Sequence, residues 1–282
     1  VLPDALARIN KELPSAAIDE AILKISNVES GTLEQRNETF NDYLQSGVEV
    51  RYFDGEQDRD EIVRLLDFDD PGNNDFHVVN QWTFVEYSEK RPDVIVFVNG
   101  MPLVMFELKS PSREETDASD AYKQLRQYMR QIPSMFVPNV FCVMSDMSET
   151  RVGTITADED RFVAWKSVDG DYSETKAATW KTMLDGMLPK ERLLDIVRNF
   201  VCFNDSNDRI VKILAAYHQY FGVRKAIERA TKAVEGDGKI GVFWHTQGSG
   251  KSLSMVFFAH LLQSRLDSPT IVVITDRNDL DD

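Results

Sequence analysis

The spacing of apolar residues changes along the chain from a helical period to a strand period. In residues 2–46 apolar side chains recur every three or four positions, which predicts helices, the last of them over 32–44 before Gly47. Shorter apolar runs separated by Asp-Gly and Pro-Gly-Asn-Asn turns then predict strands over 48–53, 62–68 and 76–87. The first part of the chain is therefore expected to be an α/β fold.

The most apolar stretch, residues 91–109, predicts two strands joined at Asn99-Gly100. Three charged residues interrupt it: Asp93 near its start, and Glu107 and Lys109 near its end. Glu107 and Lys109 share a face because strand residues two apart point the same way. Two carboxylates beside an ammonium group suit metal-dependent phosphodiester cleavage, since carboxylate oxygens bind Mg²⁺ and the cation activates water. The alternative is that these charges form an ordinary solvated strand edge.

The length of the hairpin loop decides whether Asp93 belongs to this set. A two-residue loop would send Glu107 to the face opposite Asp93. A three-residue loop over 99–101 pairs Val98 with Pro102 and sets Asp93 opposite Glu107. We therefore expect a loop with an odd number of residues and a bulge.

A helix expected over 119–131 carries Gln124 and Tyr128 one turn apart on one flank of its apolar stripe. These two side chains either face the carboxylates, where they would bind phosphate or a water molecule, or form an ordinary helix edge. The sequence leaves open whether a helix glutamate, Glu20 or Glu34, completes the metal site. Further predictions are a strand over 140–145, a hairpin of 151–156 with 161–165, and a helix within 171–198.

The polar segment 204–208 is the best candidate for a linker. We therefore divide the chain into a first domain, 1–205, and a second, incomplete domain, 206–282. The second is expected to open with a helix over 210–233, followed by an apolar strand over 240–244.

The stretch His245-Thr-Gln-Gly-Ser-Gly-Lys-Ser252 follows that predicted strand and precedes an apolar helix over 253–262. This context indicates a phosphate-binding P-loop, although His245 replaces the first glycine of the usual pattern. The backbone N–H groups of 248–252 would surround the phosphates, Lys251 would reach the β and γ phosphates, and Ser252 would bind Mg²⁺. A strand over 270–277 would complete a parallel βαβ unit.

Composition is typical of a globular protein, with 282 residues, 42% hydrophobic and 28% charged. No apolar run approaches a membrane span and no signal pattern begins the chain. Cys142 and Cys202 lack CxxC spacing, which favours reduced thiols and a cytoplasmic location. The net charge is −15, and residues 1–180 carry 34 acidic and 18 basic side chains. DNA would have to be bound through local basic patches, metal or other subunits.

The combination of these motifs resembles the N-terminal part of the motor and cleavage (R, HsdR) subunit of type I restriction enzymes. The matching stretches are Asp67-Phe68, Asn80-Gln81, Arg91-Pro92-Asp93, Asn99-Gly100, Glu107-Leu108-Lys109, Gln124-x-x-x-Tyr128 and Trp244 through Ser252. The resemblance implies a PD-(D/E)xK-type mixed sheet flanked by helices, followed by the first part of a RecA-like P-loop domain. Within it Asp93, Glu107 and Lys109 would be catalytic, supported by Gln124 and Tyr128 as a RecB-like Gln-x-x-x-Tyr element.

The same resemblance implies that Gln219 reads adenine and that 275–277 contacts the DNA backbone. The residues expected to bind ATP are Gln219, Thr246, Gly248, Ser249, Gly250, Lys251 and Ser252, and those expected to bind Mg²⁺ are Asp93, Glu107 and Ser252. The implied function is ATP-driven translocation of double-stranded DNA coupled to endonucleolytic cleavage, in complex with methyltransferase and specificity subunits. No acidic Walker B motif precedes residue 282, so these residues alone should not hydrolyse ATP productively.

Two other functions remain open at this stage. The chain could belong to a stand-alone nuclease-helicase of DNA repair or phage defence, which would need no methyltransferase partner. It could also be a non-catalytic assembly module with a degenerate nuclease fold, in which the three charges form a salt bridge.

Overall fold

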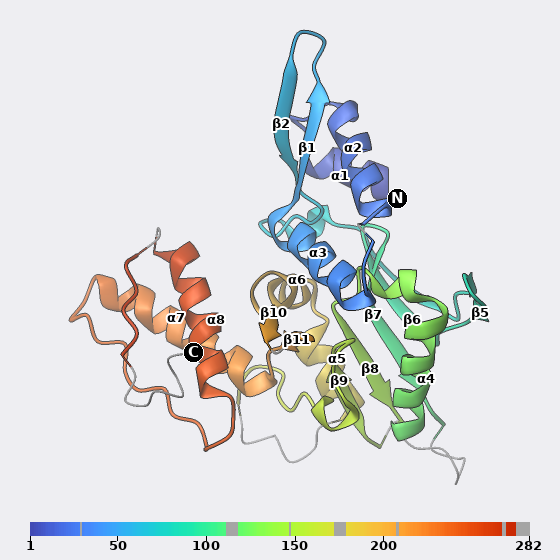
Figure 1. Cartoon of the computed structure of the whole chain (residues 1–282). Helices are drawn as coiled ribbons and strands as arrows, with labels where there is room; N and C mark the ends of the chain where they lie inside the picture. The colour runs from blue at the N-terminus through green and yellow to red at the C-terminus, as the bar shows by residue number, and fades with distance from the viewer. Residues whose placement is uncertain are drawn as a thin grey trace.

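The computed structural model describes residues 1–28, 30–110, 118–146, 148–171, 179–206, 209–266 and 269–274. A mixed β-sheet lies at the centre of the molecule and helices cover both of its faces (Figure 1). A two-stranded arm with two helices projects from one end, and two long helices near the C-terminus pack beside the central body.

Three helices begin the chain, as the helical period predicts: α1 (Leu2–Ile9), α2 (Ser15–Ser26) and α3 (Leu33–Ser46). Thr32 and Gln35 cap α3 reciprocally, because each side chain binds the backbone N–H of the other residue. Gly47 ends α3 with a φ of +89°, a conformation that glycine adopts without strain.

The arm consists of β1 (Val48–Phe53) and β2 (Asp58–Val63), paired antiparallel and packed on α2. β1 matches the predicted strand, whereas the predicted strand over 62–68 is wrong. The turn after Phe53 sets the register, so the charged segment that follows it pairs with β1. One face of the arm is exposed to solvent, and charged residues are stable there.

The central sheet has five strands in the order β3-β6-β7-β8-β9. Their bounds are β3 (Phe76–Asn80), β6 (Val94–Val98), β7 (Met101–Leu108), β8 (Phe141–Ser145) and β9 (Thr150–Gly153). Only β7 and β8 are parallel, and α4 (Ala118–Gln131) lies in the connection between them. This mixed sheet flanked by helices confirms the predicted fold class, and α4 and β8 confirm the elements predicted at 119–131 and 140–145.

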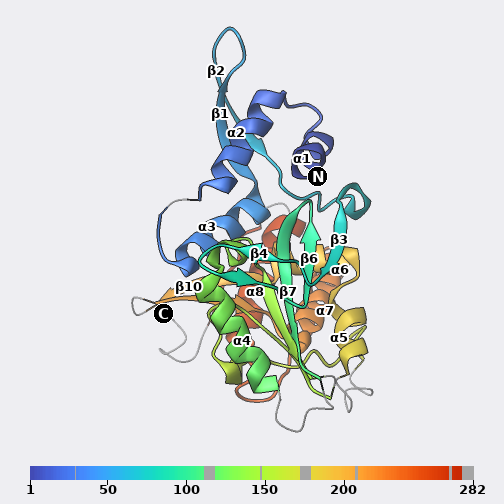
Figure 2. The same ribbon diagram turned by 90° about the vertical axis from the view of Figure 1, so that its right-hand side faces the viewer.

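The two faces of the sheet bury separate groups of apolar residues. α4 covers one face, where Ile95, Met105 and Met144 from three strands meet Leu125 of α4 (Figure 2). The opposite face packs against α3, α5 (Trp180–Met187) and α6 (Lys190–Asn199). Because the side chains of each strand alternate between the faces, any residue in register with Ile95 or Met105 lies on the α4 face.

The segment before β6 differs from its prediction. β3 ends at Asn80, and a short hairpin of β4 (Phe84–Val85) and β5 (Glu89–Lys90) follows instead of a continuous strand over 76–87. Gln81, immediately after β3, has a left-handed φ of +51°, which interrupts the extended conformation. The predicted hairpin of 151–156 with 161–165 is reduced to β9 and a single bridge, Val152 to Val163, beside a 3-10 turn.

The chain after α6 forms a hairpin of β10 (Val201–Ser206) and β11 (Arg209–Leu214). The predicted helix over 210–233 therefore begins too early, and α7 runs over Tyr217–Val234. The β-branched residues Ile210, Val211 and Ile213 favour a strand. The predicted linker 204–208 lies at this hairpin, with 207–208 outside the described residues. The division at 205/206 remains a proposal.

α8 (Lys251–Arg265) packs on α7 and contains the apolar helix predicted at 253–262. The strands predicted at 240–244 and 270–277 are not formed in the described residues, 275–277 lying outside them. Val242 is 94% exposed and Ile274 is 90% exposed. A parallel strand is stable only between neighbouring strands, and no described strand pairs with either segment. No described helix has both the length and the apolar character needed to cross a membrane.

Candidate nuclease and P-loop sites

The β6–β7 hairpin turns in two residues, so the predicted three-residue loop is wrong. Val98 pairs with Met101 across Asn99 and Gly100, whose φ values of +52° and +84° are typical of a tight hairpin turn. The predicted bulge is present, because Phe97 pairs with Pro102 and Val96 with Val104. Leu103 is the extra residue.

This bulge restores the register that brings the charged residues together. Val94 pairs with Phe106, so the next position sets Asp93 opposite Glu107. Asp93 lies two residues before Ile95, and Glu107 lies two residues after Met105. Strand residues two apart point to the same face, so Asp93 and Glu107 lie on the α4 face with Ile95 and Met105. Asp93 Oδ2 accepts a hydrogen bond of 2.8 Å from the N–H of Leu108, which places its carboxylate at the end of β7.

Lys109 completes the cluster, as its spacing from Glu107 predicts. Its Nζ donates to Glu107 Oε1 over 2.7 Å. Glu107 is only 4% exposed, and its second carboxylate oxygen, Oε2, is buried without a hydrogen-bond partner. Burial raises the pKa of Glu107, the hydrogen bond from Lys109 opposes this increase, and the charge of Asp93 adds to it. A buried carboxylate oxygen without a partner is costly unless a ligand binds it.

α4 places Tyr128 and Gln124 beside this cluster. Burial raises the pKa of the Tyr128 hydroxyl, and the charge of Glu107 raises it further, while Gln124 interacts with the same hydroxyl. Gln124 Nε2 also donates to Gln127 Oε1 over 3.3 Å. The structure thus places Tyr128 beside Glu107 and Gln124 beside Tyr128, and the roles expected for these two residues stay predictions.

The donor set fits a hard divalent cation. Asp93 and Glu107 present carboxylate oxygens on one face, and the free Glu107 Oε2 lies among them. In the part of the chain that the structure describes, no group of three or more Asp, Glu, His or Cys residues is placed to hold a metal. The remaining positions would be filled by water and phosphate oxygens, because Mg²⁺ usually keeps several waters.

The predicted P-loop lies at the N-terminus of α8. Gly248 and Gly250 have φ values of +78° and +74°. A side chain at Gly250 would come within 2.5 Å of Gln219 Nε2, whereas a Cβ at Gly248 would meet open space. Lys251 Nζ donates to the carbonyl oxygens of His245 and Thr246, over 3.2 and 3.1 Å. The Lys251 ammonium group is therefore bound to the carbonyl oxygens of a loop in which two glycines adopt positive φ values. A lysine beside such a loop at a helix N-terminus fits a phosphate-binding site.

The remaining predicted ATP residues surround the same loop. Ser252 is exposed in the first turn of α8, Thr246 contributes its carbonyl to Lys251, and the Ser249 hydroxyl is buried without a partner. Gln219 is 4% exposed; its Oε1 accepts the N–H of Ala216, and its Nε2 donates to the carbonyl of Gly250 over 3.1 Å. Reading adenine would require Gln219 to exchange these bonds, so that role stays a prediction.

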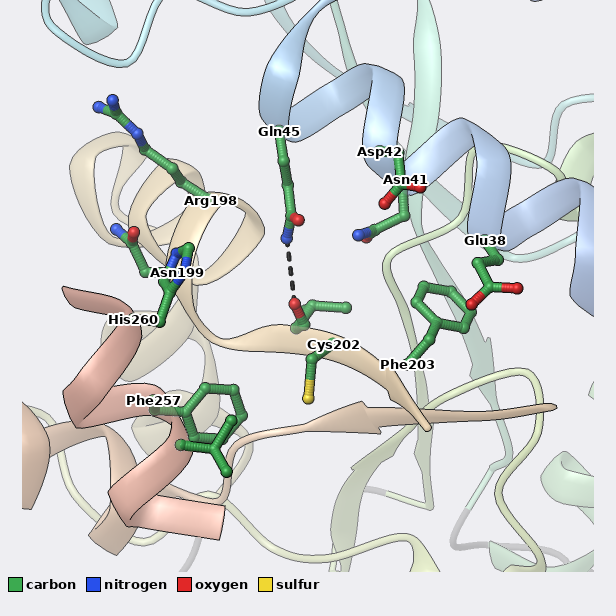
Figure 3. Close-up of a pocket in the computed structure, with 12 residues that line it drawn as sticks. Glu38, Asn41, Asp42, Gln45, Arg198, Asn199, Cys202, Phe203, Phe257 and His260 are labelled. Atoms are coloured by element: carbon green, nitrogen blue, oxygen red, sulfur yellow. Dashed lines mark hydrogen bonds between the residues drawn. The ribbon is translucent and has the colours of Figure 1, made fainter. Parts of the chain in front are cut away.

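A separate cavity of about 290 Å³ lies between the central body and α8 (Figure 3). Glu38, Asp42 and Gln45 reach it from α3, Arg198 from α6 and His260 from α8. Gln45 Nε2 donates to the carbonyl of Val201 over 3.0 Å. This cavity adjoins neither the carboxylate cluster nor the P-loop residues.

Two structural features were not foreseen. Arg91 donates two hydrogen bonds to Gln81. In the sequence, only the Arg-Pro-Asp run distinguishes this arginine. Lys212 is a buried lysine in β11 whose Nζ donates to Asn37 Oδ1 over 2.9 Å and to the carbonyl of Asn139 over 2.6 Å. No pattern could reveal Lys212, because its partners are far away in the sequence.

Two protein families match parts of this chain. The family described as type I restriction enzyme R protein N terminus matches residues 1–161, more than half of the chain, and the SWI2/SNF2 ATPase family matches residues 218–282. The type I restriction enzyme HindI endonuclease subunit of Haemophilus influenzae is 43% identical over 99% of this chain and 28% of its own length. The type I restriction enzyme SauCOLORF180P endonuclease subunit of Staphylococcus aureus is 28% identical over 79% of this chain and 23% of its own length.

These matches cover the carboxylate cluster with one family and the P-loop with the other. The chain spans about a quarter of the length of these relatives. From the extent of the first match and the identity to the Haemophilus influenzae protein, the chain belongs to the family of the type I restriction enzyme R protein N terminus.

Proposed function

We propose that this chain provides the nuclease centre and the nucleotide-binding loop of a restriction endonuclease subunit. The reaction is Mg²⁺-dependent hydrolysis of phosphodiester bonds in double-stranded DNA, coupled to ATP-dependent translocation by the whole protein. The observation that carries the proposal is the convergence of Asp93, Glu107 and Lys109 on the α4 face, with Glu107 Oε2 buried and without a partner.

Each residue has a role that follows from its position. Asp93 and Glu107 would hold Mg²⁺, which when bound neutralises phosphate charge and lowers the pKa of a coordinated water. Lys109, oriented by its bond to Glu107, would place positive charge beside the scissile phosphate. Tyr128 and Gln124 would hold the phosphate or a water molecule from the α4 side.

The P-loop supports the second half of the proposal. Lys251 would exchange its backbone carbonyl partners for the β and γ phosphates of ATP, and Ser252 would bind the accompanying Mg²⁺. Methyltransferase and specificity subunits would supply sequence recognition, in keeping with an acidic chain of net charge −15.

Calorimetric titration of the chain with Mg²⁺ or Mn²⁺ tests the nuclease centre. We expect one site that Asp93→Ala abolishes and that the arm variant Asp58→Ala leaves unchanged. Lys109→Ala should still bind metal, while cleavage of duplex DNA falls by orders of magnitude. Absence of metal binding in the unaltered chain would favour the non-catalytic assembly module.

Co-purification separates the remaining alternative. A type I subunit should be isolated from its host with methyltransferase and specificity subunits. A full-length protein that cleaves DNA but never co-purifies with such subunits would instead be a stand-alone nuclease-helicase.

A further inference from the structure

Gln81 adopts a left-handed backbone conformation. Among the described residues, only Gln81 and Asn99 have positive φ values without being glycine, at +51° and +52°. Asn99 belongs to the β6–β7 turn, where such values are expected. Gln81 is an exposed residue directly after β3. A left-handed conformation at a non-glycine residue costs free energy and tends to occur at functional sites.

This conformation ties Gln81 to the nuclease centre. Its N–H donates to the carbonyl oxygen of Asp93 over 2.8 Å. Asn80 pairs with Val94, so Gln81 lies opposite Asp93 at the next position. The backbone of the catalytic carboxylate is therefore held directly by Gln81.

Gln81 also holds the guanidinium group of Arg91. Arg91 Nε donates to the Gln81 carbonyl oxygen over 3.1 Å, and its NH2 group donates to Gln81 Oε1 over 2.7 Å. Both acceptors are neutral. No described carboxylate forms an ion pair with Arg91. In a chain of net charge −15, this arginine is therefore oriented by neutral groups and not by a carboxylate.

Arg91 stands two residues before Asp93. Gln81 contacts Asp93 through its backbone N–H and Arg91 through its carbonyl and side-chain oxygens, so both residues are held together at the start of β6. Beside Gln81, the ring of Trp82 lies 6.0 Å from that of Phe97 and is 48% exposed. An oriented arginine and an exposed aromatic ring next to a catalytic carboxylate are features of a nucleic-acid contact surface.

We propose that Arg91, held in place by Gln81, binds the DNA phosphate next to the one that is cleaved. This inference rests on the proposed nuclease function and adds a substrate-binding residue to it. Arg91 positions the DNA strand over Asp93 and Glu107, and Gln81 is a positioning residue that acts through Arg91.

Fluorescence anisotropy of a labelled 20-base-pair duplex, titrated with the chain in Ca²⁺ at several salt concentrations, tests this contact. For Arg91→Ala we expect the Kd to rise about tenfold, because a charge-assisted bond is lost. The slope of log Kd against log salt should fall by about 0.9, the value for one phosphate contact. Arg51→Ala, an exposed arginine of the arm, is the matched control and should change neither quantity.

Gln81→Gly separates the positioning role from a structural one. Glycine adopts a positive φ without strain, so the thermal stability should be unchanged or higher. It retains the backbone carbonyl that binds Arg91 but loses the side-chain acceptor, and the Kd for the duplex should rise about threefold. A purely structural role would predict lower stability and an unchanged Kd.

The outcomes distinguish this inference from the proposed function. If the unaltered chain binds DNA and Mg²⁺ but Arg91→Ala changes neither Kd nor the salt slope, the contact is refuted and the nuclease centre stands. If the unaltered chain binds neither duplex DNA nor Mg²⁺, both proposals fail.

Discussion

Glu107 places a carboxylate in the interior of the protein, at the end of β7. Its carboxylate is 4% exposed and has only one bonded oxygen, although Lys109 partly compensates. Burial raises its pKa, so the ionised form that a metal site needs destabilises the metal-free fold. The stability contribution of this group is present at low pH and is lost as pH rises through its raised pKa.

We therefore expect Glu107→Gln to stabilise the metal-free protein. The amide keeps the shape of the side chain and removes the buried charge, so Tm in EDTA at pH 8 should rise by about 2–4 °C. Thermal unfolding in EDTA and in Mg²⁺ measures this: Mg²⁺ should raise Tm of the unaltered chain but not that of the variant. A lower Tm for the variant in EDTA would show that the charged form is favoured by the fold.

Lys212 is the second residue whose charge and burial conflict. It is 3% exposed, and burial lowers its pKa to about 7. The neighbouring Cys142 supplies no compensating negative charge, because burial raises the pKa of its thiol to about 12. Lys212 therefore releases its proton in the folded state at a pH where an unfolded lysine keeps it.

This difference predicts stability that rises with pH. Between about pH 7 and pH 10 the unfolded chain binds more protons than the folded chain at this position, so the free energy of unfolding increases with pH. Urea unfolding at pH 6.5 and pH 9 should show a larger gain for the unaltered chain than for Lys212→Met. Equal gains in the two proteins would mean that the lysine stays protonated in the fold.

At the scale of elements, the turn and bulge of the β6–β7 hairpin decide that Asp93 lies opposite Glu107. Asn99 anchors the turn: its Nδ2 donates to the carbonyl of Leu65 and to Asn74 Oδ1, each over 2.9 Å, and its Oδ1 accepts the N–H of Asp75 over 2.8 Å. A buried side chain with three hydrogen bonds and a left-handed backbone is specified almost completely by its surroundings.

Asn99→Ala should consequently lower the free energy of unfolding by about 3 kcal/mol, through three lost bonds and backbone strain. Asn99→Gly is the matched variant, because it loses the same bonds but not the favourable conformation, and it should be less damaging. Denaturant unfolding gives both values. A larger loss for glycine than for alanine would contradict the role assigned to the positive φ.

At the scale of the whole molecule, α8 packs directly against the body that carries Asp93, Glu107 and Lys109. The rings of Phe257 in α8 and Phe200 lie 5.6 Å apart, and Phe257 lines the cavity shown in Figure 3. The helix that begins at the P-loop therefore packs on α6, which lies against one face of the central sheet.

For the full-length protein we expect Lys251→Ala to abolish translocation, because the β and γ phosphates lose their ammonium partner. Cleavage that depends on translocation should be lost as well, whereas Mg²⁺ binding at Asp93 and Glu107 should persist. A translocation assay and calorimetry on the same preparation measure the two effects. Retained translocation would remove the P-loop from the mechanism.

Much of the fold could be read from local patterns. The helices before Gly47, the strand 48–53, α4 and the helix after the P-loop follow from apolar period and capping, which act within a few residues. The strand predictions were wrong where pairing between strands overrides the local conformational preference of the residues. Charged residues 58–61 became a strand because β1 pairs with them, and apolar residues 240–244 did not, because no described strand does.

The sequence by itself determined the candidate chemistry: Asp93, Glu107 and Lys109 in one hairpin, and the glycines and Lys251 of the P-loop before a helix. Only the tertiary structure decided that the three charged residues meet. The Asn99-Gly100 turn alone would have separated Asp93 from Glu107, and the bulge at Leu103 reversed that outcome. The clamp of Arg91 by Gln81 depends on the pairing of β3 with β6. Such long-range pairing depends on packing across the whole sheet, which no local pattern encodes.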